Sequence, residues 1–262
     1  MIICWYYQRQ GRKQKMKLLI MTDLEGVSGV VDWDRKKRTP EEDAYLQYLM
    51  TNEVNGAVEG ALKGGAKEVW VAECHPIDIR QIHPEAMLYK NSAHKSTPAA
   101  IGMKKGRWDA MAFIGNHPMA GTENGVLSHT QNGNVESIHL NNILVGEFGI
   151  QAAIAGDFEM PMIMVSGDRD ACKQAKELIP DIETAIVKYG ISTYSAWCLS
   201  PQKSRELIAG KTEKAVKNWK KIKPFIVKGP VTLREEMKDS MVREVKASTV
   251  AEAFEIRCER NR

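Results

Sequence analysis

Short runs of apolar residues alternate with longer amphipathic segments along this chain, which is the pattern of strands joined by helices. The runs predict strands at Met16–Thr22, Glu68–Ala72, Trp108–Gly115 and Pro161–Ser166, and a further strand at Ala185–Lys188. The amphipathic segments predict helices at Thr39–Lys63, at about Glu147–Gly156, from Asp168 onward, at Pro201–Lys220 and at Thr249–Arg257. This alternation favours a sheet that is covered by helices.

The segment after the first strand carries signals for both ends of a long helix. Thr39 can cap the helix, Pro40 suits its first turn, and the acids at 41–43 favour its positive end. Gly64-Gly65 is expected to end it. Because the strand at 68–72 follows, the chain begins with a β-α-β unit, whose crossover is expected to be right-handed.

Two later segments depart from this alternation. Residues 135–140 and 143–145 are separated by Asn141-Asn142, which predicts a hairpin with a tight turn. Pro230 to Glu235 predicts one more strand before the final helix. The whole pattern predicts an α/β fold, a three-layer α/β/α sandwich with a mostly parallel or mixed sheet and a smaller C-terminal part. We expect a catalytic domain at 16–220 and the smaller part, packed on it, at 221–262.

Net charge changes this picture only at the N-terminus. The chain of 262 residues carries a formal charge of +4, which alone would suggest a nucleic-acid partner. Residues 1–15 hold four basic residues and no acid, however. Without those four, the 37 basic residues fall to 33, which equals the 33 acidic residues. The body of the chain is therefore neutral, and no nucleic-acid partner is expected.

The first 15 residues predict a leader that the fold does not need. The leader is basic and aromatic, and its apolar residues precede its charges, the reverse of a secretory signal. We expect a disordered tail, or a natural start at Met16; an anchor at a membrane surface is a weaker alternative. No run approaches the ~20 apolar residues of a membrane span. Five widely spaced cysteines without a C-x-x-C favour reduced thiols and a cytoplasmic location.

Acids and histidines follow several of the predicted strands. Asp23 and Glu25 come after the first strand, His75 after the second, and His117 after the third. Ligands in open α/β sheets gather at the carboxyl ends of strands, so these side chains are expected to meet. Two carboxylates spaced i, i+2 point the same way on an extended chain and need a cation or a raised pKa. A polar loop with a capping aspartate explains Asp23 and Glu25 equally well.

One further acid, Glu147, would complete a set of five ligands. Carboxylate and imidazole together suit zinc, and suit manganese or iron less well. Three carboxylates and two imidazoles can hold two divalent ions if one carboxylate bridges them, which leaves His129 for proton transfer or attack. The chain has no H-E-x-x-H, P-loop, G-x-S-x-G or G-x-G-x-x-G motif that would point elsewhere.

Five motifs in a fixed order make a more specific pattern than any one of them. They are T-D-L-E-G-V-S-G at 22–29, E-C-H at 73–75, G-N-H at 115–117, G-V-L-S-H-T at 125–130 and V-G-E-F-G at 145–149. This set resembles the zinc-dependent D-aminopeptidases of the DppA type, from about Met16 to Lys188 and more loosely beyond.

The resemblance implies a two-zinc amide hydrolase that cleaves the N-terminal residue of short peptides, with D-residues among its substrates. It implies that Asp23 bridges the ions, that Glu25, His75, His117 and Glu147 complete the ligands, and that His129 is catalytic. It also implies a homo-oligomer, a decameric ring whose inner chamber admits only short peptides. One departure is Glu73, where the family usually has an aspartate two residues before the ligand histidine.

Two other functions remain open at this stage. A two-metal phosphoesterase would use the same ligand types. A dipeptide-binding or transport-linked protein could use metal only to hold its loops.

Overall fold

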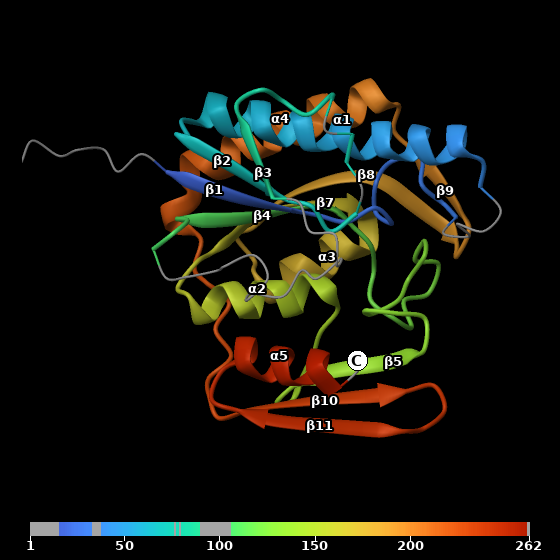
Figure 1. The fold of residues 1–262 in the computed structure, drawn as a ribbon, viewed down its shortest axis with the longest axis vertical. Helices are drawn as coiled ribbons and strands as arrows, with labels where there is room; N and C mark the ends of the chain where they lie inside the picture. The colour runs from blue at the N-terminus through green and yellow to red at the C-terminus, as the bar shows by residue number, and fades with distance from the viewer. Residues whose placement is uncertain (1–15, 33–37, 76, 79, 90–105, 261–262) are drawn as a thin grey trace, which may run out of the picture.

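A seven-stranded sheet forms the centre of the computed structural model, which describes residues 16–32, 38–75, 77–78, 80–89 and 106–260 (Figure 1). Its strands lie in the order β3-β2-β1-β4-β7-β8-β9, and every neighbouring pair is parallel except β8 and β9. They are β1 (Lys17–Thr22), β2 (Glu68–Ala72), β3 (Ala86–Tyr89), β4 (Ala110–Asn116), β7 (Met162–Asp168), β8 (Glu183–Ser192) and β9 (Ser195–Cys198). The leader predicted at 1–15 lies outside the described residues.

Helices cover both faces of this sheet. On one face lie α1 (Pro40–Gly64) and α4 (Pro201–Asn218), the latter followed by a 3₁₀ turn η1 (Trp219–Lys221). On the other lie α2 (Glu147–Asp157) and α3 (Arg169–Leu178). Strands β4 and β7 are buried along their whole length because helices shield both of their faces. The predicted three-layer α/β/α sandwich with a mixed sheet is confirmed.

A second, four-stranded sheet lies beyond α2. Its order is β11-β10-β5-β6, with β5 (Val135–Leu140), β6 (Ile143–Leu144), β10 (Val231–Met237) and β11 (Val242–Ala247). Helix α5 (Val250–Arg260) packs between this sheet and α2. The sheet takes two strands from each side of residue 220. The division of the chain at that residue stays a prediction.

Most of the predicted elements are present, and the differences concern exposed edges. The hairpin at 135–144 forms with its turn at Asn141, whose φ of 54° is left-handed. The pattern missed β3, β9 and β11, which are short strands with partly or largely exposed side chains. Strands at a sheet edge bury little apolar surface and so leave a weak periodic signal.

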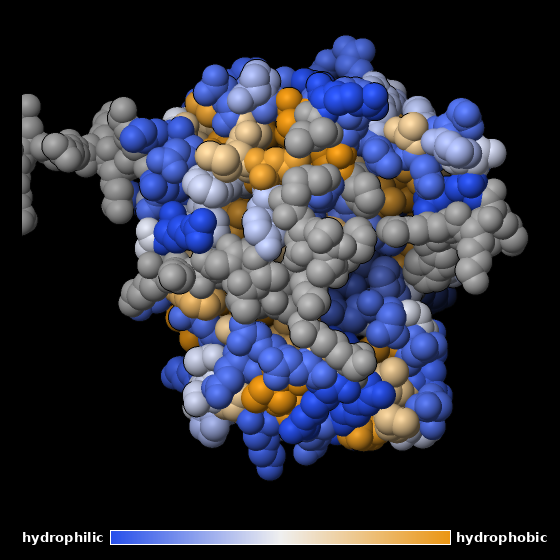
Figure 2. Space-filling view, in the orientation of Figure 1, coloured by the Kyte–Doolittle hydropathy of each residue, from blue (hydrophilic) through white to orange (hydrophobic). Residues whose placement is uncertain are grey.

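The surface and the helices of the described residues show no feature of a membrane-spanning segment. The face in Figure 2 is mainly hydrophilic, with small apolar patches. Among the described residues, no helix combines the length and apolar composition needed to cross a bilayer.

Glycines let α1 and α4 approach closely. Gly56, Gly60 and Gly64 recur every four residues along α1 and so share one face. A Cβ at Gly60 would lie 2.1 Å from the carbonyl oxygen of Ala209, a backbone atom that cannot move aside alone. The stripe therefore fixes how deeply α4 sits against α1.

We expect Gly60→Ala to destabilise the protein by about 2 kcal/mol, because the clash outweighs the ~1 kcal/mol gained from helix propensity. Gly210→Ala is the matched control, since a Cβ at this α4 glycine meets nothing within 4 Å. It should stabilise the protein by about 0.5–1 kcal/mol. Urea unfolding of both variants measures the difference, and equal shifts would contradict the close-packing argument.

Candidate metal centre

The candidate site lies where the chain reverses the direction in which it adds strands. From β1 the sheet grows through β2 to β3, and the chain then returns to place β4 on the other side of β1. Such a switch point leaves a crevice at the carboxyl ends of the strands. Asp23 follows β1, His75 follows β2, and His117 follows β4. The structure brings these predicted residues together there.

A single carboxylate lies between two imidazoles. Asp23 is 4% exposed. Its Oδ1 lies 3.3 Å from Nε2 of His75, and its Oδ2 lies 3.4 Å from Nε2 of His117. Each carboxylate oxygen of Asp23 therefore faces a different histidine.

The backbone around Asp23 is held against β4. The amide of Asp23 donates to the carbonyl of Ile114 at 2.8 Å, and Gly26 N–H donates to Gly115 O at 2.7 Å. A Cβ at Gly26 would lie 2.0 Å from the carbonyl oxygen of Asn116. The close approach of the two strand ends thus requires glycine at position 26.

Two groups of candidate ligands flank this carboxylate. In the first, Oε2 of Glu25 lies 3.2 Å from Nε2 of His75. In the second, Oε1 of Glu147 lies 3.5 Å from Nε2 of His117 and 3.7 Å from Nε2 of His129. Within each group of three residues, Asp23–Glu25–His75 and His117–His129–Glu147, the ligand atoms lie within 4.8 Å of one another. All six predicted site residues therefore meet.

Backbone carbonyls orient two of the histidines. Nδ1 of His117 lies 2.9 Å from the carbonyl of Pro118, and Nδ1 of His129 lies 2.8 Å from that of Leu127. Because a carbonyl only accepts, Nδ1 carries the proton of each neutral ring and Nε2 presents a lone pair. The rings of His117 and His129 stack with centroids 3.9 Å apart and an 8° interplanar angle. Both Nε2 atoms consequently face Glu147.

The donor set of the site fits a cation. Oδ2 of Asp23, Oε2 of Glu25 and Nε2 of His117 are buried and accept no hydrogen bond from the described residues. With His117 neutral, all three atoms are acceptors, and their burial together is costly unless a positive charge, either a proton or a metal ion, binds there. Oxygen and imidazole nitrogen are ligands of divalent transition metals, zinc among them.

The pKa shifts of the site residues also indicate that positive charge stabilises the site. Burial lowers the pKa of His117, but the facing carboxylates of Asp23, Glu147 and Glu25 outweigh burial and raise it to about 10. Burial and the neighbouring Asp23 carboxylate raise the pKa of Glu25 to about 7. Burial raises the pKa of Asp23 as well, but the two facing imidazoles hold it well below its ordinary value.

A cavity of about 310 Å³ opens onto Asp23, Glu25, His75, His129 and Glu147. Its wall includes Phe113 of β4, Gln151 of α2 and Phe254 of α5, together with Gln131. Gln131 has a left-handed φ of 68°, and its backbone N–H donates to Oε1 of Glu147 at 2.7 Å. Gln131 could not be predicted from the sequence, because any residue except proline can donate from its backbone N–H.

Glu73, which differs from the family pattern, contributes to the turn after the second strand. Its Oε1 accepts a hydrogen bond from the amide of Ile77 at 2.8 Å. Glu73 thus helps to shape the loop that carries His75.

A buried lysine holds the loop that carries Glu25. Lys188 of β8 is fully buried, and its Nζ donates to the carbonyls of Glu25 at 2.5 Å and Val30 at 2.6 Å. In the same loop, the amide of Ser28 donates to Oε1 of the buried Glu53 at 3.0 Å. Sequence reasoning assigned no role to Lys188 or Glu53, which lie far from the motif along the chain.

Comparison with known proteins identifies the class of this site. The family model of the peptidase family M55, described as D-aminopeptidase, matches residues 16–255. The chain therefore belongs to the D-aminopeptidase family, which confirms the resemblance of its five motifs.

Similarity to one sequence and to one solved structure, both from Bacillus subtilis, supports this assignment. A D-aminopeptidase from Bacillus subtilis (strain 168) is 36% identical over 220 residues, which cover 80% of this chain and 77% of that protein. A solved structure, the Zn-dependent D-aminopeptidase DppA from Bacillus subtilis, a self-compartmentalizing protease, is 31% identical with a TM-score of 0.84. The match to that structure covers 93% of this chain and 96% of the other.

We expect Glu53 to make stability depend on pH. Burial raises its pKa from 4.5 to about 7 in the folded protein, so the folded state binds this proton more tightly than the unfolded state. Stability should fall as pH rises from about 5 to 8, by up to about 3 kcal/mol from this group. Glu53→Gln should flatten that part of the profile, as measured by urea unfolding at each pH.

Glu41→Gln is the control, because Glu41 lies at the exposed start of α1, the helix that also carries Glu53. This variant should show the same dependence of stability on pH as the unaltered protein. An unchanged slope in Glu53→Gln would contradict the assignment to Glu53.

Proposed function

We propose that this protein is a zinc-dependent aminopeptidase that removes the N-terminal residue of short peptides, including peptides with D-residues, at a centre for two zinc ions. The observation that carries the proposal is the Asp23 carboxylate, whose two oxygens face His75 and His117 at 3.3 and 3.4 Å. A carboxylate in that position can bridge two ions, and the membership of the family supplies the reaction class.

The side chains would divide between two ions on either side of Asp23. Glu25 and His75 would hold one ion, His117 and Glu147 would hold the other, and Asp23 would serve both. When bound, zinc supplies a Lewis acid that polarises a carbonyl and lowers the pKa of a water. The orphaned acceptor atoms of Asp23, Glu25 and His117 support this assignment.

His129 is the proposed catalytic residue. Its Nδ1 is directed at the Leu127 carbonyl, so Nε2 holds the lone pair and lies 3.7 Å from Glu147. Burial and the adjacent His117 lower the pKa of His129, which keeps it neutral and able to take a proton at Nε2. A proton held there can pass to the leaving amine of the peptide.

The proposal extends to assembly and location. We propose a homo-oligomer in the cytoplasm, a decameric ring by analogy with the family. The related DppA structure is a self-compartmentalizing protease, which supports assembly into a chamber. Cys172 and Cys198 form no disulfide among the described residues, in keeping with a reducing compartment.

Asp23→Ala should lose both zinc ions, because its carboxylate serves both. Metal analysis after dialysis should find two zinc equivalents in the unaltered protein and fewer than one in the variant. Asp181→Ala, in an exposed turn, is the control and should keep two. Full zinc content in Asp23→Ala would refute the bridge.

His129→Ala should keep both zinc ions and lose about 10²–10⁴-fold in kcat, the usual contribution of a proton-transfer group. The assay compares D-Ala and L-Ala amides and dipeptides with a phosphodiester. His83→Ala, outside the cavity wall, should match the unaltered protein.

Other outcomes would select the other functions. Zinc loss in His129→Ala would make this histidine a ligand. Cleavage of the phosphodiester alone would favour a phosphoesterase, and zinc binding without turnover would favour a peptide-binding role.

A further inference from the structure

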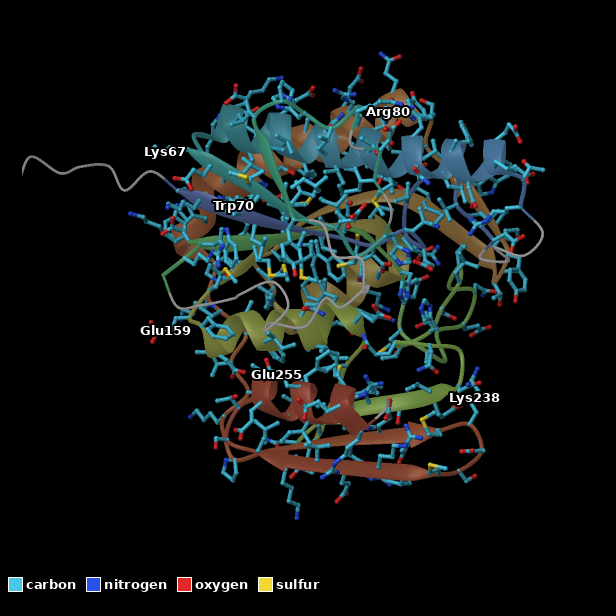
Figure 3. The ribbon with its side chains drawn as sticks, in the orientation of Figure 1. Lys67, Trp70, Arg80, Glu159, Lys238 and Glu255 are labelled. Atoms are coloured by element: carbon cyan, nitrogen blue, oxygen red, sulfur yellow. The ribbon has the colours of Figure 1, made fainter. Side chains whose placement is uncertain are left out.

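The C-terminal helix α5 reaches the metal centre from the second sheet. Glu255, labelled in Figure 3, marks this helix beside α2. Phe254 lines the cavity at the centre, and Arg257 is the next residue along α5 that is buried. The five motifs of the sequence contain no residue of α5, so its contacts with the site are independent of them.

Arg257 is anchored by a buried carboxylate. Its side chain is 7% exposed and that of Glu235, on β10, is 1% exposed. Nε of Arg257 donates to Oε1 of Glu235 at 3.0 Å, and Nη2 donates to the same oxygen. Burying such a pair costs desolvation energy that its attraction only partly returns, so stability alone is a weak reason for it.

The remaining arm of the guanidinium points toward the site. Nη1 of Arg257 donates to Oε1 of Gln131 at 3.4 Å. Gln131 has the left-handed φ described above, a conformation that a residue with a side chain holds only when its surroundings impose it. Its backbone N–H donates to Oε1 of Glu147 at 2.7 Å, and that same oxygen faces His117.

We propose that Arg257 is a positioning residue for the metal ligand Glu147, acting through Gln131. The planar guanidinium holds Glu235 on one side and the Gln131 side chain on the other, which fixes the Gln131 backbone. The Gln131 amide then fixes the Glu147 carboxylate. The inference rests on the proposed zinc centre and concerns only the ion held by His117 and Glu147.

The test measures zinc affinity in the absence of any substrate. Zinc is titrated into metal-free protein against a chromophoric chelator, which resolves a dissociation constant for each of two ions. Arg257→Met and Gln131→Met should each weaken the binding of one zinc ion by about 10-fold, the low end of the effect of disturbing a group that orients a ligand, and leave the binding of the other ion unchanged. The double variant should bind that ion with the same affinity as the more strongly affected single variant, because both substitutions break the same chain of contacts.

Arg243→Met is the matched control. Arg243 is 43% exposed and lies 3.7 Å from the other oxygen of Glu235. It should leave both zinc constants unchanged. Urea unfolding of the metal-free variants separates a change in fold stability from a change at one ion.

Gln131→Met leaves the Arg257–Glu235 pair intact, so it decides the question even if Arg257→Met fails to fold. Unchanged zinc dissociation constants in Gln131→Met would overturn the proposal. So would an equal loss of affinity for both ions that follows the loss of stability measured by urea unfolding. An unaltered protein that binds fewer than two zinc ions would instead contradict the proposed function.

Discussion

The burial of one carboxylate between two imidazoles is the constraint on which the rest of the site depends. Asp23 can occupy that position only because β1 lies between β2 and β4, so that its neighbours on both sides deliver a histidine. An acid so deeply buried is costly unless positive charge compensates it. The strand order therefore buries the Asp23 carboxylate, and that burial in turn favours binding of a cation.

The two sheets contribute to this arrangement in different ways. The large sheet supplies Asp23, Glu25, His75 and His117 from the ends of its parallel strands. The small sheet packs against α5, which supplies Phe254 to the cavity wall. Its hairpin β5–β6 leads directly into α2, whose first residue is Glu147. The second group of ligands thus lies at the junction of the two sheets, whereas the first belongs to the large sheet alone.

The sequence predicted the parts of this structure that depend on local or periodic signals. Helix α1 was predictable because Thr39, Pro40 and Gly65 mark its ends. The candidate ligands Asp23, Glu25, His75 and His117 were predictable because they follow buried strands. The strand β11 was missed because most of its side chains face solvent. The resemblance supported the roles of Glu147 and His129 that the count of possible ligands had already suggested.

Contacts that join distant segments were beyond reach of the sequence. Lys188 binds carbonyls that lie about 160 residues away, and Gln131 serves Glu147 through a backbone atom. A side chain's identity does not reveal either contact.

The pairing of β5 with β10 also sets an order in time. Synthesis proceeds from the N-terminus, so Glu147 leaves the ribosome long before Leu233, which pairs with Leu140, and before Arg257. A nascent chain therefore presents every candidate ligand while the edge of β5 is still without its neighbour. The candidate ligands are therefore synthesised before β10 and α5, the elements that complete their surroundings.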